Sequence, residues 1–336
     1  MSAILDKLLK GQNVEWLPLG EACEIADNLR KPVKSSLRVA GNIPYYGANN
    51  IQDYVEGYTH NGEYVLIAED GSANLENYSI QWATGKFWAN NHVHVVKGKE
   101  NLDSRFLYHF LRFMNFIPYL TGGDRAKLTK AKMVEIPIPI PPLDVQAEIV
   151  RILDAFTAVT AELTAELNMR EKQYQYYRDK LLSFSSDEIN WKSLGEVALN
   201  LDSKRKPVTS GLRQSGNIPY YGASGIVDYV KDFIFDGDFL LVSEDGANLL
   251  ARSTPIAFSI SGKTWVNNHA HVLKFETYEE RKFVEYYLNS IDLTSYISGS
   301  AQPKLNKQSL NSIKIPCPSL DEQKRIVEIL DKFETL

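Results

Sequence analysis

A long internal duplication constrains the fold of this chain more than any other feature of its sequence. The segment Gly41-Asn-Ile-Pro-Tyr-Tyr-Gly-Ala48 recurs letter for letter as Gly216-Asn-Ile-Pro-Tyr-Tyr-Gly-Ala223. Further pairs follow in the same order: Trp16 and Trp191, Glu69-Asp70-Gly71 and Glu244-Asp245-Gly246, Lys127-Leu128 and Lys304-Leu305, Asp144-x-Gln146 and Asp321-x-Gln323. Two similar domains in one polypeptide imitate a homodimer, and such a molecule suits a target that also has two related halves.

The bulk properties indicate a soluble protein with more than one domain. A chain of 336 residues with 44% hydrophobic and 24% charged residues is long for a single core. It has no apolar run of 18 residues and its first residues lack the order of a signal peptide, so we expect a cytoplasmic protein without a membrane partner. Cys23 and Cys317 are far apart and unrepeated, which argues against a disulfide or metal framework.

The distribution of basic residues favours a role in binding nucleic acid, although the net charge of −5 argues mildly against such a role. Basic residues gather in both copies and in a third stretch from Arg125 to Lys132. The step Arg30-Lys31-Pro32 recurs as Arg205-Lys206-Pro207. Basic runs are often only solvated faces, but this recurrence favours a binding role.

The expected elements change from strands to helices within each copy. Residues 43–98 are rich in Tyr, Val and Gly and predict short strands, whereas residues 104–116 and 280–290 predict helices. Alternate prolines make residues 136–142 extended, and we expect a domain boundary there. Asp144 to Leu182 then predicts one helix of 39 residues, or roughly 58 Å, with a coiled-coil-like apolar stripe.

The second copy of the long helix is shorter. It starts with the capping box Ser319-x-x-Glu322 and the sequence ends at Leu336. Because Asp6-Lys-Leu-Leu9 echoes Asp179-Lys-Leu-Leu182, we interpret the repeat as circular, with its seam inside one spacer helix.

These elements predict an α+β protein. We expect two similar α/β domains in a pseudo-two-fold arrangement, separated by long coiled-coil-like helices of which the distal one is truncated. The expected division is a first domain with an N-terminal helical tail (1–142), a central spacer helix (143–184), a second domain (185–319) and the start of the distal spacer helix (320–336).

We predict no catalytic residue and no metal site in this chain. Asn42-Ile-Pro-Tyr45 resembles the Asn-Pro-Pro-Tyr motif of amino-methyltransferases, but its second position differs and no glycine-rich cofactor loop follows a strand. His92-x-His94 and its copy at His269 and His271 lack further ligands, so structural, hydrogen-bonding histidines are favoured. Glu69-Asp70-Gly71 favours a turn whose acids accept hydrogen bonds or orient a basic side chain.

The order of the repeated motifs, each series followed by a proline-rich exit and a long helix, resembles the DNA-specificity subunit of type I restriction–modification enzymes. Thr160-Ala-Glu-Leu-Thr164-Ala-Glu-Leu167 is similar to the tandem tetrapeptide of the IC subgroup, in which the copy number sets the half-site spacing. The resemblance implies a non-catalytic subunit with two target-recognition domains, each reading one half of a bipartite site in double-stranded DNA.

The resemblance also implies partners. Two modification subunits would dock on the spacer helices and two restriction subunits would complete the complex, with S-adenosylmethionine, ATP and Mg²⁺ on those partners and no cofactor here. The short distal helix suggests self-association with a second copy. The alternative is a DNA methyltransferase with its own specificity domain.

The candidate DNA-binding residues are basic, aromatic or amide side chains near the repeated motifs. Lysine favours phosphate contacts and arginine can also bind guanine, whereas the tyrosines either line the groove or pack inside. The candidates are Arg30, Lys31, Lys34, Tyr46, Arg125, Lys127 and Lys130 in the first copy, and Arg205, Lys206, Tyr221, Gln302, Lys304 and Lys307 in the second.

Residues shared by the two copies are expected to be mostly scaffold, because domains that read different half-sites must differ where they read. Sequence discrimination should therefore lie where the copies diverge, as at 123–125 against 300–302. The high overall similarity of the copies predicts related half-sites in inverted orientation.

Overall fold

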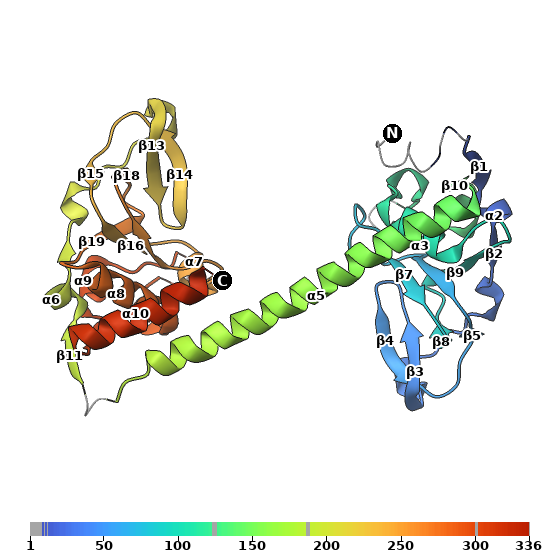
Figure 1. Ribbon diagram of the computed structural model, residues 1–336, viewed down its shortest axis with the longest axis horizontal. Helices are drawn as coiled ribbons and strands as arrows, with labels where there is room; N and C mark the ends of the chain where they lie inside the picture. The colour runs from blue at the N-terminus through green and yellow to red at the C-terminus, as the bar shows by residue number, and fades with distance from the viewer. Residues whose placement is uncertain are drawn as a thin grey trace. The chain divides into compact units, whose positions relative to one another are not determined.

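The computed structural model describes residues 9, 11, 13–122, 126–185, 189–299 and 302–335. They divide into two compact units, residues 1–164 and 165–336. Figure 1 shows that each unit combines sheets with helices, which confirms the predicted pair of similar α/β domains with a long helix between them in sequence.

The first unit is built on two four-stranded sheets. In both sheets the neighbouring strands are antiparallel, except that β3 and β8 are parallel. One sheet has the order β2 (Cys23–Ile25), β9 (Val93–Gly98), β6 (Tyr64–Ala68), β7 (Ile80–Ala83), and the other has the order β4 (Ile51–Val55), β3 (Ala40–Tyr46), β8 (Lys86–Ala89), β5 (His60–Asn61).

The central strands of the first sheet are buried on both faces. Successive side chains of a strand point to opposite faces, and in β6 the side chains of Val65 and Ile67 join the core beneath the helices. Leu66 points the other way and packs with Phe87 of the second sheet. This is why the run Val65–Ala68 is apolar throughout rather than alternating.

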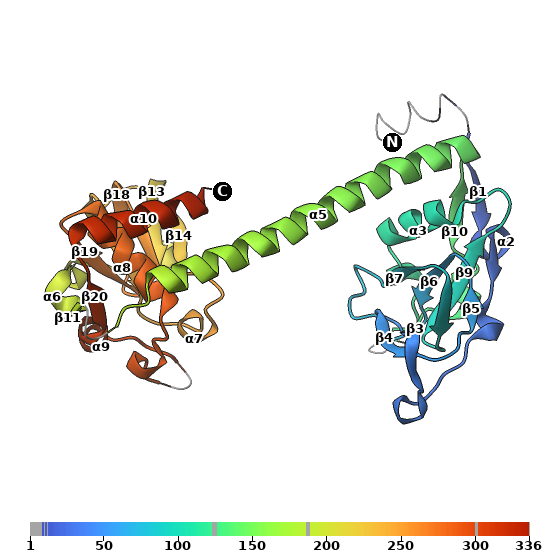
Figure 2. The same ribbon diagram turned by 60° about the horizontal axis from the view of Figure 1, so that its bottom comes forward.

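Helices and a small two-stranded sheet complete the first unit. The helices are α2 (Leu19–Ala22), α3 (Ser104–Phe113) and α4 (Lys130–Met133), and α3 lies against the β2-β9-β6-β7 sheet (Figure 2). The carboxylate of Asp103 caps α3 by accepting from the Phe106 amide at 2.7 Å. The segment 136–142, expected to be an extended domain boundary, contains a strand, β10 (Pro137–Ile140), which pairs with β1 (Glu15–Pro18) and so belongs to the unit.

The second unit repeats this arrangement strand for strand. Its sheets have the orders β12-β19-β16-β17, β14-β13-β18-β15 and β11-β20. The strands are β11 (Asn190–Ser193), β12 (Leu199–Asn200), β13 (Ser215–Gly222), β14 (Gly225–Val230), β15 (Phe235–Asp236), β16 (Phe239–Ser243), β17 (Ala257–Ile260), β18 (Lys263–Val266), β19 (Ala270–Lys274) and β20 (Lys314–Cys317). The helices are α6 (Leu194–Val197), α7 (Asn248–Ala251), α8 (Tyr278–Ser290), α9 (Lys307–Ser312) and α10 (Leu320–Glu334).

The predicted long helix is present as α5 (Leu143–Leu181), with 39 residues. Its first turn is held by the buried side chain of Gln146, which donates to the carbonyls of Asn101 and Pro141 and accepts from the Asp103 amide. Every side chain from 155 to 173 is exposed. The helix is too polar to cross a membrane, and no other helix in the described parts of the chain qualifies.

Candidate nucleic-acid interface

An ion-pair cluster organises the first unit beneath its surface. The 3-10 turn Asp27–Leu29 leads directly into Arg30. The guanidinium of Arg30 donates to Glu69 Oε2 and to the Val93 carbonyl, both at 2.7 Å, and lies 3.3 Å from Asp27 Oδ2. Arg30 therefore joins the turn to the ends of two strands, β6 and β9.

His94 and Lys127 extend this cluster in opposite directions. The imidazole of His94 is fully buried, with Nδ1 2.7 Å from Asp27 Oδ2 and Nε2 2.8 Å from the Leu128 carbonyl. The ammonium of Lys127 lies 2.8 Å from Glu69 Oε1 at the surface. The cluster thus ties the loop around Lys127 to the strand that carries His94.

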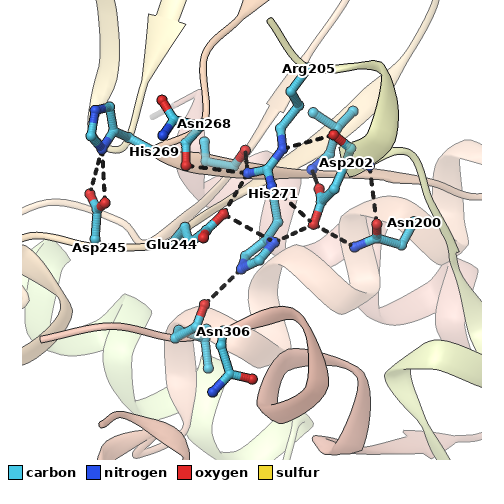
Figure 3. A network of polar contacts seen from close by, with 12 residues as sticks. Asn200, Asp202, Arg205, Glu244, Asp245, Asn268, His269, His271 and Asn306 are labelled. Atoms are coloured by element: carbon cyan, nitrogen blue, oxygen red, sulfur yellow. Dashed lines mark hydrogen bonds and ion pairs between the residues drawn. The ribbon is translucent and has the colours of Figure 1, made fainter. Parts of the chain in front are cut away.

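The second unit contains the same cluster, which Figure 3 shows from close by. Arg205 bridges Glu244, at 2.5 Å, and Asp202, at 3.5 Å. His271 Nδ1 lies 2.6 Å from the Asp202 carboxylate and Lys304 Nζ lies 3.2 Å from Glu244. The same five residue types form the cluster at corresponding positions of both units, so the cluster belongs to the repeated domain.

The carboxylates of the cluster are held in their charged form. Burial by itself raises the pKa of Asp27, but the hydrogen bonds from His94 and Val95 and the charge of Arg30 outweigh it and lower the pKa. The pKa of Glu69 is also lowered, because its hydrogen bonds from Lys127 and Arg30 outweigh the effect of burial. Asp202 and Glu244 are shifted in the same direction for corresponding reasons.

The cluster contains a set of potential metal ligands, because the ligand atoms of Asp202, Glu244 and His271 lie within 4.8 Å of one another. However, Arg205 already lies against both carboxylates and Lys304 against one of them. These cations supply the positive charge that a metal ion would supply, so we assign the cluster a structural role.

The repeated Arg-Lys-Pro step is clamped to the second sheet through its main chain. The Lys31 amide donates to the Ala89 carbonyl at 3.0 Å, and the Lys31 carbonyl accepts from Trp88 Nε1 at 2.7 Å. In the second unit Lys206 is held in the same way by Val266 and Trp265. Because the main chain is held from inside, the side chains of Lys31 and Lys206 are presented to solvent.

The structure favours a different role for Arg30 and Arg205 from the DNA contact expected of them. Their side chains are only 16% and 13% exposed and are committed to internal carboxylates. We therefore regard both as positioning residues beneath the surface. Asp27 and Asp202 were not predicted as partners of these arginines. The two aspartates are nonetheless separated by 175 residues, the same offset that separates the two Arg-Lys-Pro steps.

The lysine candidates lie at the surface of the two units. Lys127 and Lys304 keep 43% and 53% of their side chains exposed while they pair with Glu69 and Glu244. The remaining basic and amide candidates are exposed: Lys31, Lys34, Lys130, Lys206, Gln302 and Lys307. Arg125 lies outside the described residues.

Tyr46 and Tyr221 are half-buried and pack against aromatic rings. The Tyr46 ring lies edge-on to Phe87, with centroids 5.8 Å apart, and Tyr221 lies 6.2 Å from Phe258. Burial raises the pKa of both hydroxyls. Of the two interpretations left open by the sequence, these contacts favour packing.

An open hollow of about 760 Å³ lies beside the cluster in the first unit. At its wall the exposed ring of His92 is held by Asp70, with Nδ1 2.5 Å from Oδ1, and His269 and Asp245 form the same pair in the second unit (Figure 3). The other lining residues include Ala48, Asn49, Gln52, Gly71, Ser72 and Lys127. The hollow thus combines a lysine with hydrogen-bonding side chains on a braced wall.

Comparison with known proteins identifies relatives of this chain. The model of the type I restriction modification DNA specificity domain matches twice, at residues 12–170 and 187–336. A putative type I restriction enzyme specificity subunit from Haemophilus influenzae is 52% identical over 99% of this chain and 90% of the relative. A type I restriction enzyme specificity subunit from Escherichia coli is 33% identical over 99% of this chain and 89% of the relative.

A solved structure shows the same fold. The S subunit of a type I restriction–modification system from Mycoplasma genitalium superposes with a TM-score of 0.72 and 17% sequence identity, over 97% of this chain and 92% of that one.

The two matches to the specificity-domain model, one in each unit, place this duplicated α/β protein in a class that recognises DNA rather than one that transforms it. The chain belongs to the type I restriction–modification DNA-specificity family, and it is the non-catalytic specificity subunit. The relatives described above give no support to the alternative of a methyltransferase with its own specificity domain.

Proposed function

We propose that each unit reads one half of a bipartite DNA target. The surface around the Arg-Lys-Pro step faces the duplex in both units, together with the hollow in the first unit. The observation that carries this proposal is that both units clamp the same main-chain segment from inside and present the same lysines outside. Lysine side chains on such a surface bind phosphates, while groups in the hollow are available to base edges.

The functional division that we propose follows the sequence: target-recognition domains at 1–142 and 185–319, a central spacer helix at 143–184 and the start of a distal spacer at 320–336. The boundary between the two compact units instead falls within α5, between Thr164 and Ala165. The uninterrupted helical hydrogen bonding of α5 supports treating it as one segment.

For partners, we infer that modification subunits dock on α5. Its middle part exposes Phe156, Val159, Leu163 and Leu167, each with more than half of its surface accessible. Exposed apolar groups at helical spacing are typical of a face that binds another protein. Two modification and two restriction subunits would form the complex and carry S-adenosylmethionine, ATP and Mg²⁺.

The double variant Lys31→Gln/Lys206→Gln tests the DNA-facing surface. Each phosphate contact that is lost should reduce the slope of log affinity against log salt by about 0.9, so the double variant should lose roughly 2. The measurement is a salt titration of binding to a duplex that carries the methylation motif directed by the wild-type chain.

The matched control is Lys97→Gln/Lys274→Gln. It removes two exposed lysines toward the ends of β9 and β19 that lie away from His92 and His269. This control should keep the wild-type salt slope. Equal losses for the two double variants would mean that the lysines act only through net charge, and the proposed surface would be abandoned.

A further inference from the structure

The hairpin that borders the hollow is nearly invariant between the two units. β3 and β4 form it in the first unit and β13 and β14 in the second (Figure 1). Over the fifteen residues 41–55 and 216–230, twelve are identical. The three differences are Asn49 against Ser224 and Asn50 against Gly225, both at the tip, and Gln52 against Val227.

The third difference falls on a β-bulge. In the first unit Tyr45 pairs with Asp53 and Tyr46 with Ile51, so Gln52 is the extra residue of its strand. In the second unit the same shift leaves Val227 as the extra residue. A bulge leaves one residue out of the ladder and redirects its side chain, and bulges are frequent beside functional sites.

A glycine at the end of the facing strand, Gly47 directly after β3 and Gly222 as the last residue of β13, lies against the bulge side chain. A Cβ on Gly47 would lie 2.1 Å from Gln52 Nε2, and a Cβ on Gly222 would lie 3.0 Å from a methyl group of Val227. Both side chains therefore lie against the space that a Cβ on the glycine would take; the overlap would be large for Gln52 and slight for Val227. The same position beside the glycine thus holds an amide group in the first unit and an isopropyl group in the second.

The environment of Gln52 leaves its amide nitrogen available, while its oxygen accepts one long hydrogen bond. Gln52 lines the hollow together with His92 and Lys127, and its side chain is exposed. The buried amide of Asn90 donates to Gln52 Oε1 at 3.4 Å, and no hydrogen bond within the described residues engages Gln52 Nε2. In the second unit Val227 is 56% exposed.

In contrast, both polar atoms of the side chain of Asn49, at the tip of the hairpin, are engaged in hydrogen bonds within the domain. Its Nδ2 donates to the Gly71 carbonyl at 2.7 Å and its Oδ1 accepts from the Ala73 amide at 2.8 Å. Both ends of the amide thus brace the loop after β6. Asn50 Oδ1 likewise accepts from the next main-chain amide, that of Ile51.

We propose that the bulge position, Gln52 in the first domain and Val227 in the second, determines one base of each half-site. A glutamine amide forms a bidentate pair with N7 and N6 of adenine in the major groove, whereas an apolar side chain contacts the thymine methyl group. The first half-site therefore has adenine where the second has thymine at the base facing the bulge. The inference rests on the proposed function, since it assumes that each domain reads one half-site.

The test is selection of bound duplexes from a randomised pool by the full chain in complex with its modification subunits. Gln52→Val should reduce the preference for adenine at one position of one half-site by roughly 5- to 150-fold, the range of a bidentate contact, and favour thymine there. Val227→Gln should replace thymine by adenine at one position of the other half-site. Each substitution places in one hairpin a residue that the other hairpin already carries, so both variants should fold, which thermal melting checks.

The control exchanges a difference at the tip that does not line the hollow. Asn50→Gly gives the first hairpin a tip residue of the second and should leave the selected bases unchanged. The inference is overturned if this tip variant changes the base while Gln52→Val does not, or if Gln52→Val leaves a wild-type two-part motif intact. A wild-type chain that selects no two-part motif would instead reject the proposed function.

Discussion

The Asp27 carboxylate makes three contacts through its two oxygens, two with strand β9 and one with Arg30. Oδ1 accepts from the Val95 amide at 2.8 Å, while Oδ2 faces His94 and Arg30. The side chain of Asp27 is only 6% exposed. Removal of one charged member of such a buried group leaves its partners without a compensating charge. The resulting loss in the free energy of unfolding exceeds the net contribution of the intact ion pair.

Asp27→Asn should therefore lower the free energy of unfolding at neutral pH by about 3 kcal/mol, because Arg30 and His94 lose their charged partner. The lowered pKa of Asp27 also sets the direction of the pH dependence. The stability it contributes is complete above its unfolded pKa of about 4 and is lost as the pH falls through the folded pKa. Chemical denaturation of the first domain at pH 7 and below pH 4 measures both effects.

The control for this prediction is Asp53→Asn. Asp53 keeps 43% of its side chain exposed and pairs with Arg38 at 3.3 Å, so its loss should change the free energy of unfolding by less than about 1 kcal/mol. If Asp27→Asn shows the same acid sensitivity as the wild type, the acid sensitivity must come from other groups.

At the scale of elements, the long helix α5 differs along its length. Its start is anchored by Gln146 and by Asp154, whose carboxylate accepts from Arg105 and lies 2.8 Å from His109. Near its end, Tyr177 stacks on Phe333 of α10. Among the described residues, no hydrogen bond or ion pair joins the repeated Thr160–Leu167 segment between these anchors to another element. The Thr164 hydroxyl donates to the Thr160 carbonyl within the helix.

Insertion of one more Thr-Ala-Glu-Leu after Leu167 should therefore leave both anchors intact. Four helical residues add about 6 Å along the axis, and one base pair advances the duplex by about 3.4 Å. We expect the selected half-sites to stay the same and the spacer between them to grow by one to two base pairs. Selection from a randomised duplex pool reads both quantities; an unchanged spacer would show that α5 does not set the spacing.

At the scale of the whole molecule, each unit has its own cores. Leu111 of α3 is fully buried in the core of the first unit, and Leu288 of α8 is fully buried at the corresponding place in the second. No hydrophobic cluster of the described residues draws its buried members from both units. We therefore expect the two units to fold and unfold independently of each other.

Leu111→Ala and Leu288→Ala form a matched pair that tests this separation. Each should cost about 2–5 kcal/mol, because a large side chain is removed from a packed interior. Hydrogen exchange should rise in β6 and β9 for Leu111→Ala and in β16 and β19 for Leu288→Ala. Loss of protection in all four strands with either variant would mean that the two units unfold as one.

Much of the fold was predictable because its signals are local. The proline pattern, the apolar runs and the uninterrupted helical periodicity after Pro142 each reflect neighbours in sequence. The structure added what depends on distant residues. β10 pairs with β1, more than a hundred residues earlier, and Arg30 donates to Glu69.

The role of Gln52 shows the same limit within the site. The sequence alone marks it as one of three differences between two hairpins, with nothing to separate it from the other two. Only the register of β3 and β4 shows that it is the bulged residue, seated over Gly47. Register depends on cross-strand hydrogen bonds, which a sequence pattern does not specify to the residue.

By itself the sequence determined that this protein has two copies of one domain and a long helix between them, because repeats and periodicity are local features of the chain. The specificity role followed from the resemblance of the ordered motifs to a known family. Only the tertiary structure decided which charged residues support the surface from within and which face outward. The physical reason is that burial and ion pairing depend on groups brought together from distant segments, as Asp27, Glu69 and His94 are around Arg30.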